Sequence, residues 1–300
     1  MNGVRNLKSE SGHGTVVLAT YSRPELLKQC LESIYSADLS SSIRKVIIVQ
    51  GNNPEVLKLV QSFADYNTTV IPSNPNGTPL QCINANYWMG FEFAFKKLRS
   101  EWVLCLEEDS VISKNAYSFI SQIHSTNLGR LFYRGINLGS LETGPGLAGT
   151  YSLLRMGFNG NAGVLTRKTW KSLISLKMEN ELTKYPFDGA TRYLWRTGYV
   201  VAPNLSMYMN YGWIKGTHVT ADVDKTFFIQ LEESWNSNIG THDYCELEIA
   251  HSWGQDVRSF RYREQPRAIL FYILYRFLGH DAMHKILMRR HRKAESRTII

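Results

Sequence analysis

The chain has 300 residues, of which 43% are hydrophobic and 20% are charged, with a formal net charge of +8 and four cysteines. These proportions are ordinary for a soluble globular protein with a substantial core, and no run reaches the roughly 18–20 apolar residues of a membrane-spanning helix. Residues 1–12 are polar and lack an apolar signal core, and the cysteines lie too far apart for a metal-ligand or redox motif, so nothing demands an oxidising compartment.

Strands and helices alternate through the first half of the chain. Apolar runs predict strands over 15–20, 45–49, 69–72 and 102–106, and periodic apolar positions predict helices after Pro24 and over 56–63, 82–98 and 114–124. This alternation predicts an α/β fold, a mostly parallel central sheet flanked by helices with right-handed crossovers. Neither a G-x-G-x-x-G motif nor a P-loop is present, so a nucleotide would bind through another arrangement.

The second half is less regular. Short apolar runs predict strands over 131–134, 160–165 and 199–203, and a short helix is expected over 188–196. The glycine-rich stretch 140–157 is interpreted as a long loop, and long loops in compact domains are often lids over active sites.

Three acidic residues, Glu107, Glu108 and Asp109, end the fourth predicted strand. A parallel strand delivers its last residues to the edge of the sheet where ligands bind. Carboxylates at that edge suit a divalent cation, which prefers oxygen ligands and can bridge to a phosphate. The alternative is a solvated strand end, or an acidic cap on the helix that follows.

Several segments carry a family resemblance by their order and spacing. They are 21–27 after the first strand, 83–88, 107–111, 137–139, 185–188, 204–206, 211–212 and 216–218. Together they resemble the GT-A glycosyltransferases, most closely the N-acetylglucosaminyltransferase I and protein O-mannose N-acetylglucosaminyltransferase type, with an N-terminal half that also resembles the family-2 transferases. The likeness runs from about residue 15 to 224. It implies a GT-A domain over 1–257, with a donor-binding half over about 14–125 and an acceptor-binding half over about 126–257.

The resemblance implies a metal-dependent, inverting transfer of a sugar, N-acetylglucosamine among the candidates, from a nucleotide diphosphate to a hydroxyl of a glycan or lipid-linked saccharide. Asp109 would bind Mn²⁺ or Mg²⁺, His218 would be a further metal contact, and Asp188 would be the general base. The residues expected to bind the donor are Thr20, Arg23, Gln50, Glu107 and Glu108.

Three of these residues have a plainer interpretation. Asp188 could be the N-cap of the predicted helix that follows it, His218 a solvated loop residue, and Arg23 a surface residue before Pro24. Gln50 stands where the family often carries an aspartate that contacts uracil. An amide offers both a donor and an acceptor to a base, and a UDP-sugar remains the favoured donor.

Two other functions remain open. A sugar nucleotidyltransferase shares the α/β sheet and the metal requirement, although such enzymes usually begin with a glycine-rich loop that is missing here. A non-catalytic carbohydrate- or membrane-binding protein on a GT-A scaffold is the second alternative, because fold does not guarantee function. Four aromatic residues could form an acceptor platform or simply pack a core: Trp195, Tyr208, Tyr211 and Trp213.

The C-terminal segment 258–300 holds eleven Lys and Arg but three Asp and Glu, which accounts for the whole net charge of +8. The body of the protein is therefore balanced, and no nucleic-acid partner is expected. An apolar run over 268–278 ends at Gly279 and is followed by a basic stretch. Residues 266–297 could form a basic amphipathic helix that lies on an anionic membrane surface. The protein would then be cytoplasmic and bound to the inner face of the membrane. Alternatively, this segment could pack on the domain.

Overall fold

The computed structural model describes most of the first half of the chain and selected segments of the second. The described residues are 14–127, 132–139, 151–154 (backbone), 161–180, 182, 187, 198–203, 206–211, 269–270, 273–274, 277–278, 282–283 and 285. The predicted helix over 188–196, residues Asp188 and His218, and most of the loop over 140–157 lie outside them. In the described part of the chain, no helix is both long enough and apolar enough to cross a bilayer.

The first half alternates between strands and helices, as predicted. Its elements are β1 (Gly14–Thr20), α1 (Pro24–Ser36), β2 (Arg44–Gln50), α2 (Pro54–Phe63), β3 (Thr68–Ser73), α3 (Pro79–Glu92) and β4 (Trp102–Glu107). A short 3-10 turn, Ser40–Ser42, precedes β2, and a π-helical turn, Phe93–Lys97, extends α3. The apolar residues that recur at helical spacing after Pro24 are the buried residues of α1: Leu26, Leu27, Cys30, Leu31 and Ile34.

Local signals in the sequence start these helices. Asn53 accepts hydrogen bonds from the N–H groups of Glu55 and Val56 and so caps α2. Thr78 and Gln81 form a reciprocal capping box at the start of α3. A Cβ atom on Gly90 would lie 2.4 Å from Val17 Cγ1, so a glycine is required where α3 presses against β1.

The second half adds the remaining elements. They are β5 (Ser110–Ile112), α4 (Ala116–Asn127), β6 (Tyr133–Asn137), β7 (Tyr151–Leu154), β8 (Gly163–Thr166), α5 (Arg167–Ser175), a 3-10 turn at Met178–Asn180, β9 (Tyr199–Pro203) and β10 (Tyr208–Asn210). The interpretation of 140–157 as a continuous loop was wrong over 151–154, where β7 pairs with β9. Neither β5, β10 nor α5 was predicted, because short strands are defined by their distant partners and α5 begins directly where β8 ends.

Eight strands form one mixed sheet in the order β3-β2-β1-β4-β8-β6-β9-β7. The pairings β3-β2, β2-β1, β1-β4 and β6-β9 are parallel, whereas β8 is antiparallel to both β4 and β6, and β7 to β9. The predicted α/β class with a mostly parallel central sheet is therefore confirmed. The carboxyl ends of β1, β2, β3 and β4 meet at the same edge of the sheet.

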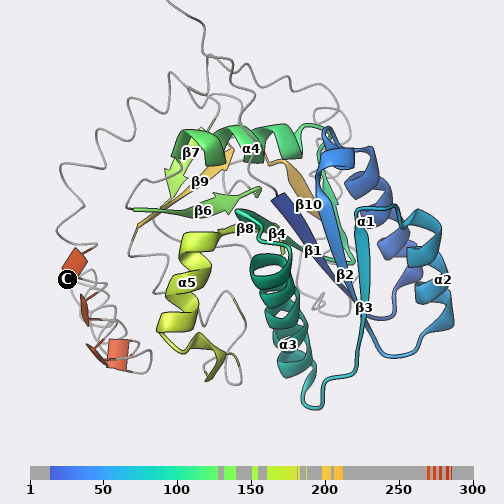
Figure 1. The fold of residues 1–300 in the computed structure, drawn as a ribbon, viewed down its shortest axis with the longest axis horizontal. Coiled ribbons are helices and arrows are strands. Elements are labelled where there is room, and N and C mark those ends of the chain that lie inside the picture. The colour runs from blue at the N-terminus through green and yellow to red at the C-terminus, as the bar shows by residue number, and fades with distance from the viewer. Residues whose placement is uncertain are drawn as a thin grey trace, which may run out of the picture.

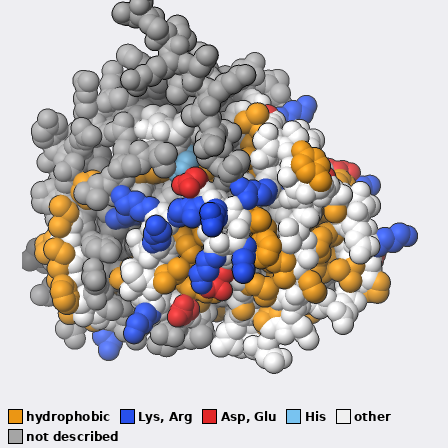
Figure 2. Space-filling model, in the orientation of Figure 1, with side chains coloured by type: hydrophobic (Ala, Val, Ile, Leu, Met, Phe, Trp, Pro, Cys, Tyr) orange, Lys and Arg blue, Asp and Glu red, His pale blue; other side chains and the backbone are white. Residues whose placement is uncertain are grey.

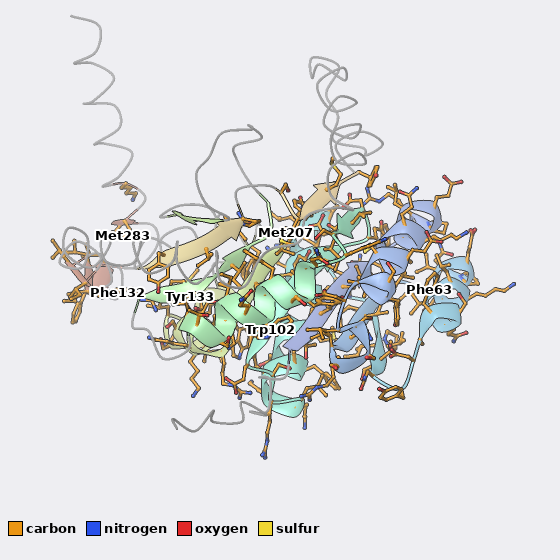
Figure 3. The ribbon with its side chains drawn as sticks, turned by 90° about the horizontal axis from the view of Figure 1, so that it is seen from above. Phe63, Trp102, Phe132, Tyr133, Met207 and Met283 are labelled. Carbon is orange, nitrogen blue, oxygen red and sulfur yellow. The ribbon has the colours of Figure 1, made fainter. Side chains whose placement is uncertain are left out.

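Helices cover both faces of the sheet (Figure 1). One core cluster joins α1, α2 and α4 to strand residues such as Val16 and Leu18, and the other joins α3 and α5 to Val17 and Ala19. Successive residues of β1 thus face opposite layers, as the two-residue period of a strand requires. Figure 3 labels three members of the first cluster, Trp102, Tyr133 and Met207. Cys30 and Cys105 are buried free thiols and pack as small core residues, one in each cluster.

His124, near the end of α4, is a buried ionisable group in this layer. The residue is only 5% exposed, and neither ring nitrogen has a hydrogen-bond partner. Its ring lies 6.1 Å from that of Tyr133, between ring centres. Burial lowers the pKa of His124 from 6.5 to about 4, since a charged imidazolium cannot be solvated there.

We expect His124 to make the fold sensitive to mild acid. Between pH 6.5 and 4 the unfolded chain binds a proton that the folded chain excludes, so stability falls as pH falls through this range. The largest effect near pH 4 is roughly 3 kcal/mol. Urea unfolding of the wild type and of His124→Phe at several pH values checks this, and the variant should lose less stability on acidification. Equal losses in both proteins would contradict it.

Candidate functional site

The acidic turn, defined here as Glu107–Asp109, lies where the order of the sheet reverses. From β1 the chain moves to β2 and β3 on one side and then returns to place β4 on the other. β1 and β4 are parallel neighbours, with Ala19 aligned to Glu107. In open α/β sheets, ligands bind outside the carboxyl ends of the strands at such a switch point. The acidic turn and the loop that joins β1 to α1 therefore occupy the position where a ligand is expected.

Glu108 ties the acidic turn to the β1–α1 loop. Its Oε2 accepts hydrogen bonds from Thr20 Oγ1 (2.9 Å) and from the Tyr21 N–H (2.7 Å). Its Oε1 accepts one from Arg23 Nε at 2.6 Å. Both oxygens of this buried carboxylate are thus engaged by the loop. Three of the residues predicted to bind a donor, namely Thr20, Arg23 and Glu108, come together, and in this structure they hold one another.

Asp109 has one engaged and one unengaged carboxylate oxygen. Oδ2 lies 3.0 Å from Arg23 Nη2, in an ion pair. Oδ1 is buried and has no hydrogen-bond partner. Burial raises the pKa of Asp109, and the Arg23 guanidinium opposes that rise. A buried carboxylate oxygen without a hydrogen-bond partner is costly, so this oxygen is the atom of the turn best placed to receive a cation.

Glu107 adds a third carboxyl group to the turn. Burial, followed by the charge of Asp109, raises its pKa to about 7, while Arg23 and the nearby Tyr87 hydroxyl act in the opposite direction. One guanidinium therefore faces three carboxyl groups, and the turn carries an excess of negative charge.

Gln50, at the carboxyl end of β2, belongs to a polar network that the sequence did not reveal. Its Oε1 accepts a hydrogen bond from Asn86 Nδ2 at 2.7 Å, and Asn86 Oδ1 accepts one from Ser73 Oγ at 2.5 Å. Asn86 and Ser73 are buried, whereas Gln50 is partly exposed. Only the oxygen of the Gln50 amide takes part in this network, and its N–H₂ group does not. The feature of the sequence that could have indicated this network is the pair of amides, Asn84 and Asn86, both of which are buried in α3.

Strand β10 and Tyr211, from late in the chain, lie beside the acidic turn. β10 pairs with β5, which follows Asp109 directly, and the Tyr211 N–H donates to the Asp109 carbonyl at 2.8 Å. Tyr211 packs with Leu26 and Met209 in a small cluster beside α1. Tyr208 packs against the larger core cluster. These two tyrosines therefore follow the core-packing alternative, while Trp195 and Trp213 lie outside the described residues.

Asp188 and His218 lie outside the described residues, whereas Phe187, which precedes Asp188, lies within them. Phe187 is buried against α3, with its ring centre 5.3 Å from that of Phe91 and 6.3 Å from that of Tyr87. Tyr87 is the tyrosine beside Glu107. The main chain at Phe187 is thus anchored on the side of α3 that approaches the acidic turn.

The residues present fit a divalent cation with a single protein ligand. No group of three or more metal-ligating side chains is found in the described ranges. The unpartnered Asp109 Oδ1 and the excess negative charge of the turn suit a cation nevertheless. Mn²⁺ and Mg²⁺ commonly complete their shells with substrate phosphates and water, so one carboxylate oxygen is a sufficient protein contribution.

No family model matches the chain, and no curated protein matches it in sequence. Solved structures similar to it include a mannosyltransferase from Pyrobaculum calidifontis in complex with GDP-Man and Mn²⁺ (13% identity, TM-score 0.42, 93% of this chain and 80% of that chain). The structure of S. aureus TarS 1–349 in complex with UDP-GlcNAc is 14% identical, with a TM-score of 0.47, and the match covers 83% of this chain and 73% of that chain. A cytidylyltransferase from Leptospira borgpetersenii is 10% identical, with a TM-score of 0.39, and the match covers 78% of this chain and 99% of that chain. With identities and TM-scores this low, no activity passes from these structures to this chain.

We expect Asn86→Ala to destabilise the fold by about 1–3 kcal/mol, because Gln50 Oε1 and Ser73 Oγ would each lose a buried partner. Lys97→Ala, at an exposed position of the adjoining π-helical turn, is the matched control and should change stability by less than about 0.5 kcal/mol. Urea unfolding at pH 7 measures both. An Asn86→Ala protein as stable as the control would contradict the network.

Proposed function

We propose that the protein is a glycosyltransferase that uses a nucleotide-sugar donor. The observation that carries the proposal is the position of the acidic turn at the β1/β4 switch point, beside the first turn of α1. A helix N-terminus attracts phosphate through its unpaired N–H groups and its dipole. Carboxylates for a cation and a helix start for phosphate thus lie together, and this combination suits a nucleoside diphosphate better than either feature alone.

Each residue of the site has a proposed task. Asp109 would hold Mn²⁺ or Mg²⁺, which when bound would stabilise the charge of the leaving diphosphate. Glu108 fixes the β1–α1 loop, through which Thr20 and Arg23 would face the donor. Glu107 would orient the sugar. The Gln50 N–H₂ group would donate to a base carbonyl, such as a carbonyl of uracil.

Asp188 would accept the proton of the attacking acceptor hydroxyl. An attack in line with the leaving diphosphate inverts the anomeric carbon. A carboxylate can act as the base because it needs only to take the proton as the new bond forms. The support from the structure is the anchoring of Phe187 beside Tyr87, since Asp188 follows Phe187 in the chain. His218 remains a proposed further metal contact, and an N-acetylhexosaminyl or hexosyl group is the proposed cargo.

Asp109→Asn should lower donor turnover by at least a hundredfold, because the amide keeps the shape of the turn but binds a cation poorly. Release of nucleotide from UDP-, GDP- and CDP-sugars, with Mn²⁺, with Mg²⁺ and with a chelator, measures this. Glu55→Gln, at an exposed carboxylate in the first turn of α2, is the control and should retain full activity.

The same assay separates the rival functions. Undiminished turnover in Asp109→Asn would refute the cation site. A sugar nucleotidyltransferase would instead release pyrophosphate from a nucleoside triphosphate and a sugar phosphate. A non-catalytic carbohydrate-binding protein would release nothing from any donor, while still binding a saccharide.

We also propose that the C-terminal segment attaches the enzyme to an anionic membrane, beside a lipid-linked or glycan acceptor. Its exposed apolar side chains recur in pairs at helical spacing: Ile269, Leu270, Ile273, Leu274, Phe277 and Leu278. Figure 2 shows hydrophobic side chains along the left edge of the molecule, where Figure 1 draws the C-terminal turns. Met283 is buried in the cluster of α3 and α5, so these turns are anchored to the domain.

Basic side chains gather near the middle of the same view (Figure 2). Arg44 donates to the Leu98 carbonyl and Arg167 to the Phe95 carbonyl. Arg167 also pairs with Glu101 at 3.3 Å. The charge that would complement anionic headgroups therefore comes from the other basic side chains of this face and from those of 258–300.

Leu270→Glu/Phe277→Glu should weaken binding to vesicles that contain anionic lipid by at least tenfold, because each substitution removes a large apolar side chain from the interface. Flotation with anionic and with neutral vesicles measures this at low and high salt. Tyr66→Glu, at a side chain that is 86% exposed on the β3 side of the molecule, is the matched control. Equal flotation of the double variant and the wild type would refute the membrane proposal.

A further inference from the structure

Arg23 is the basic group that pairs with the acidic turn in this structure. Its guanidinium bridges two carboxylates, through Nε to Glu108 and through Nη2 to Asp109. The Arg23 side chain is 34% exposed, whereas those of Glu108 and Asp109 are 5% exposed. One guanidinium that can reach solvent therefore bridges two buried carboxylates and offsets only part of their charge.

The two ends of this bridge are not equivalent. Glu108 is also held by the Thr20 hydroxyl and the Tyr21 N–H, so its position is fixed independently of Arg23. Asp109 has Arg23 as its one side-chain partner in the described ranges, at 3.0 Å, compared with 2.6 Å for the contact to Glu108. Rotation about the Nε–Glu108 contact would therefore release Asp109 while Arg23 stays attached to the turn.

A divalent cation and the Arg23 guanidinium compete for Asp109. Placed together on one carboxylate without further anions, they would repel each other in a partly buried environment of low dielectric. Arg23 has the advantage in the free protein because it is tethered beside the carboxylate. A donor diphosphate changes the balance, since it brings phosphate oxygens that can ligate the cation and accept hydrogen bonds from an arginine.

We propose that Arg23 guards the cation site. In the free protein its positive charge, held 3.0 Å from Asp109 Oδ2, weakens the binding of a divalent cation at the unpartnered Oδ1. When a nucleotide diphosphate arrives with the cation, the Nη2 arm leaves Asp109 and donates to the diphosphate. Cation and donor then bind cooperatively, and Arg23 is a positioning residue that enforces this coupling. The inference rests on the proposed function, because it takes the diphosphate to be the ligand of this site.

Direct measurement of Mn²⁺ binding by the full chain tests the proposal without any transfer reaction. Titration calorimetry and the paramagnetic resonance of free Mn²⁺ would be applied without nucleotide and then with UDP or GDP. The proteins are the wild type, Arg23→Gln, Arg23→Gln/Asp109→Asn and, as a matched loss of one positive charge, Arg99→Gln. Arg99 is exposed at the amino end of β4, away from the acidic turn.

Without nucleotide, Arg23→Gln should bind Mn²⁺ at least tenfold more tightly than the wild type. The double variant should return to the weak binding of the wild type, and Arg99→Gln should not differ from it. Nucleotide should tighten Mn²⁺ binding by at least tenfold in the wild type and by less in Arg23→Gln. Equal Mn²⁺ affinity of Arg23→Gln and the wild type without nucleotide would overturn the proposal.

Two further comparisons keep the test decisive. If Arg23→Gln does not fold, Arg23→Lys replaces it, because a lysine cannot bridge both carboxylates as the planar guanidinium does. The Arg23→Lys protein should bind Mn²⁺ more tightly than the wild type. An unchanged Mn²⁺ affinity would contradict the proposed role of Arg23. Failure of every donor to release nucleotide, together with tighter Mn²⁺ binding by Arg23→Gln, would refute the glycosyltransferase and leave the guard standing.

Discussion

The attachment of the β1–α1 loop to the acidic turn organises the site. Glu108 accepts hydrogen bonds from Thr20, Tyr21 and Arg23, and so fastens the end of β4 to the end of β1 across the point where the sheet changes direction. A buried carboxylate is stable only when its oxygens are satisfied, and here the partners come from the segment that would approach a donor phosphate. The geometry of the site and the stability of this corner of the fold therefore depend on the same contacts.

Charge is the second organising factor. Glu107, Glu108 and Asp109 share one guanidinium, and burial raises the pKa of Glu107 and of Asp109. A site built in this way stores unfavourable electrostatic energy that an incoming cation would relieve. By contrast, the buried Lys45 is fully matched by Asp65 at 2.9 Å and by the Ser40 carbonyl at 2.7 Å. The Lys45–Asp65 pair is thus balanced in charge, and the acidic turn is not.

The sequence predicted what depends on local pattern. The core positions of α1, the four parallel strands of the first half and the place of the acidic turn at the end of β4 follow from periodicity and strand order. Contacts between distant segments did not follow. The Asn86–Gln50 hydrogen bond spans 36 positions, and the β10–β5 pairing joins segments about a hundred residues apart, so neither leaves a local signal. Arg23 was predicted to meet a donor, but its pairing with the acidic turn appears only in three dimensions.

The hydrogen bond from the Tyr211 N–H to the Asp109 carbonyl has a consequence for how the protein is made. β4 also needs β8, from the second half, to cover its free edge. During synthesis, the backbone of the acidic turn gains its last partner only after residue 211 of 300 has emerged from the ribosome. A nascent or truncated chain that ends earlier would carry the acidic residues on an unfinished edge of the sheet.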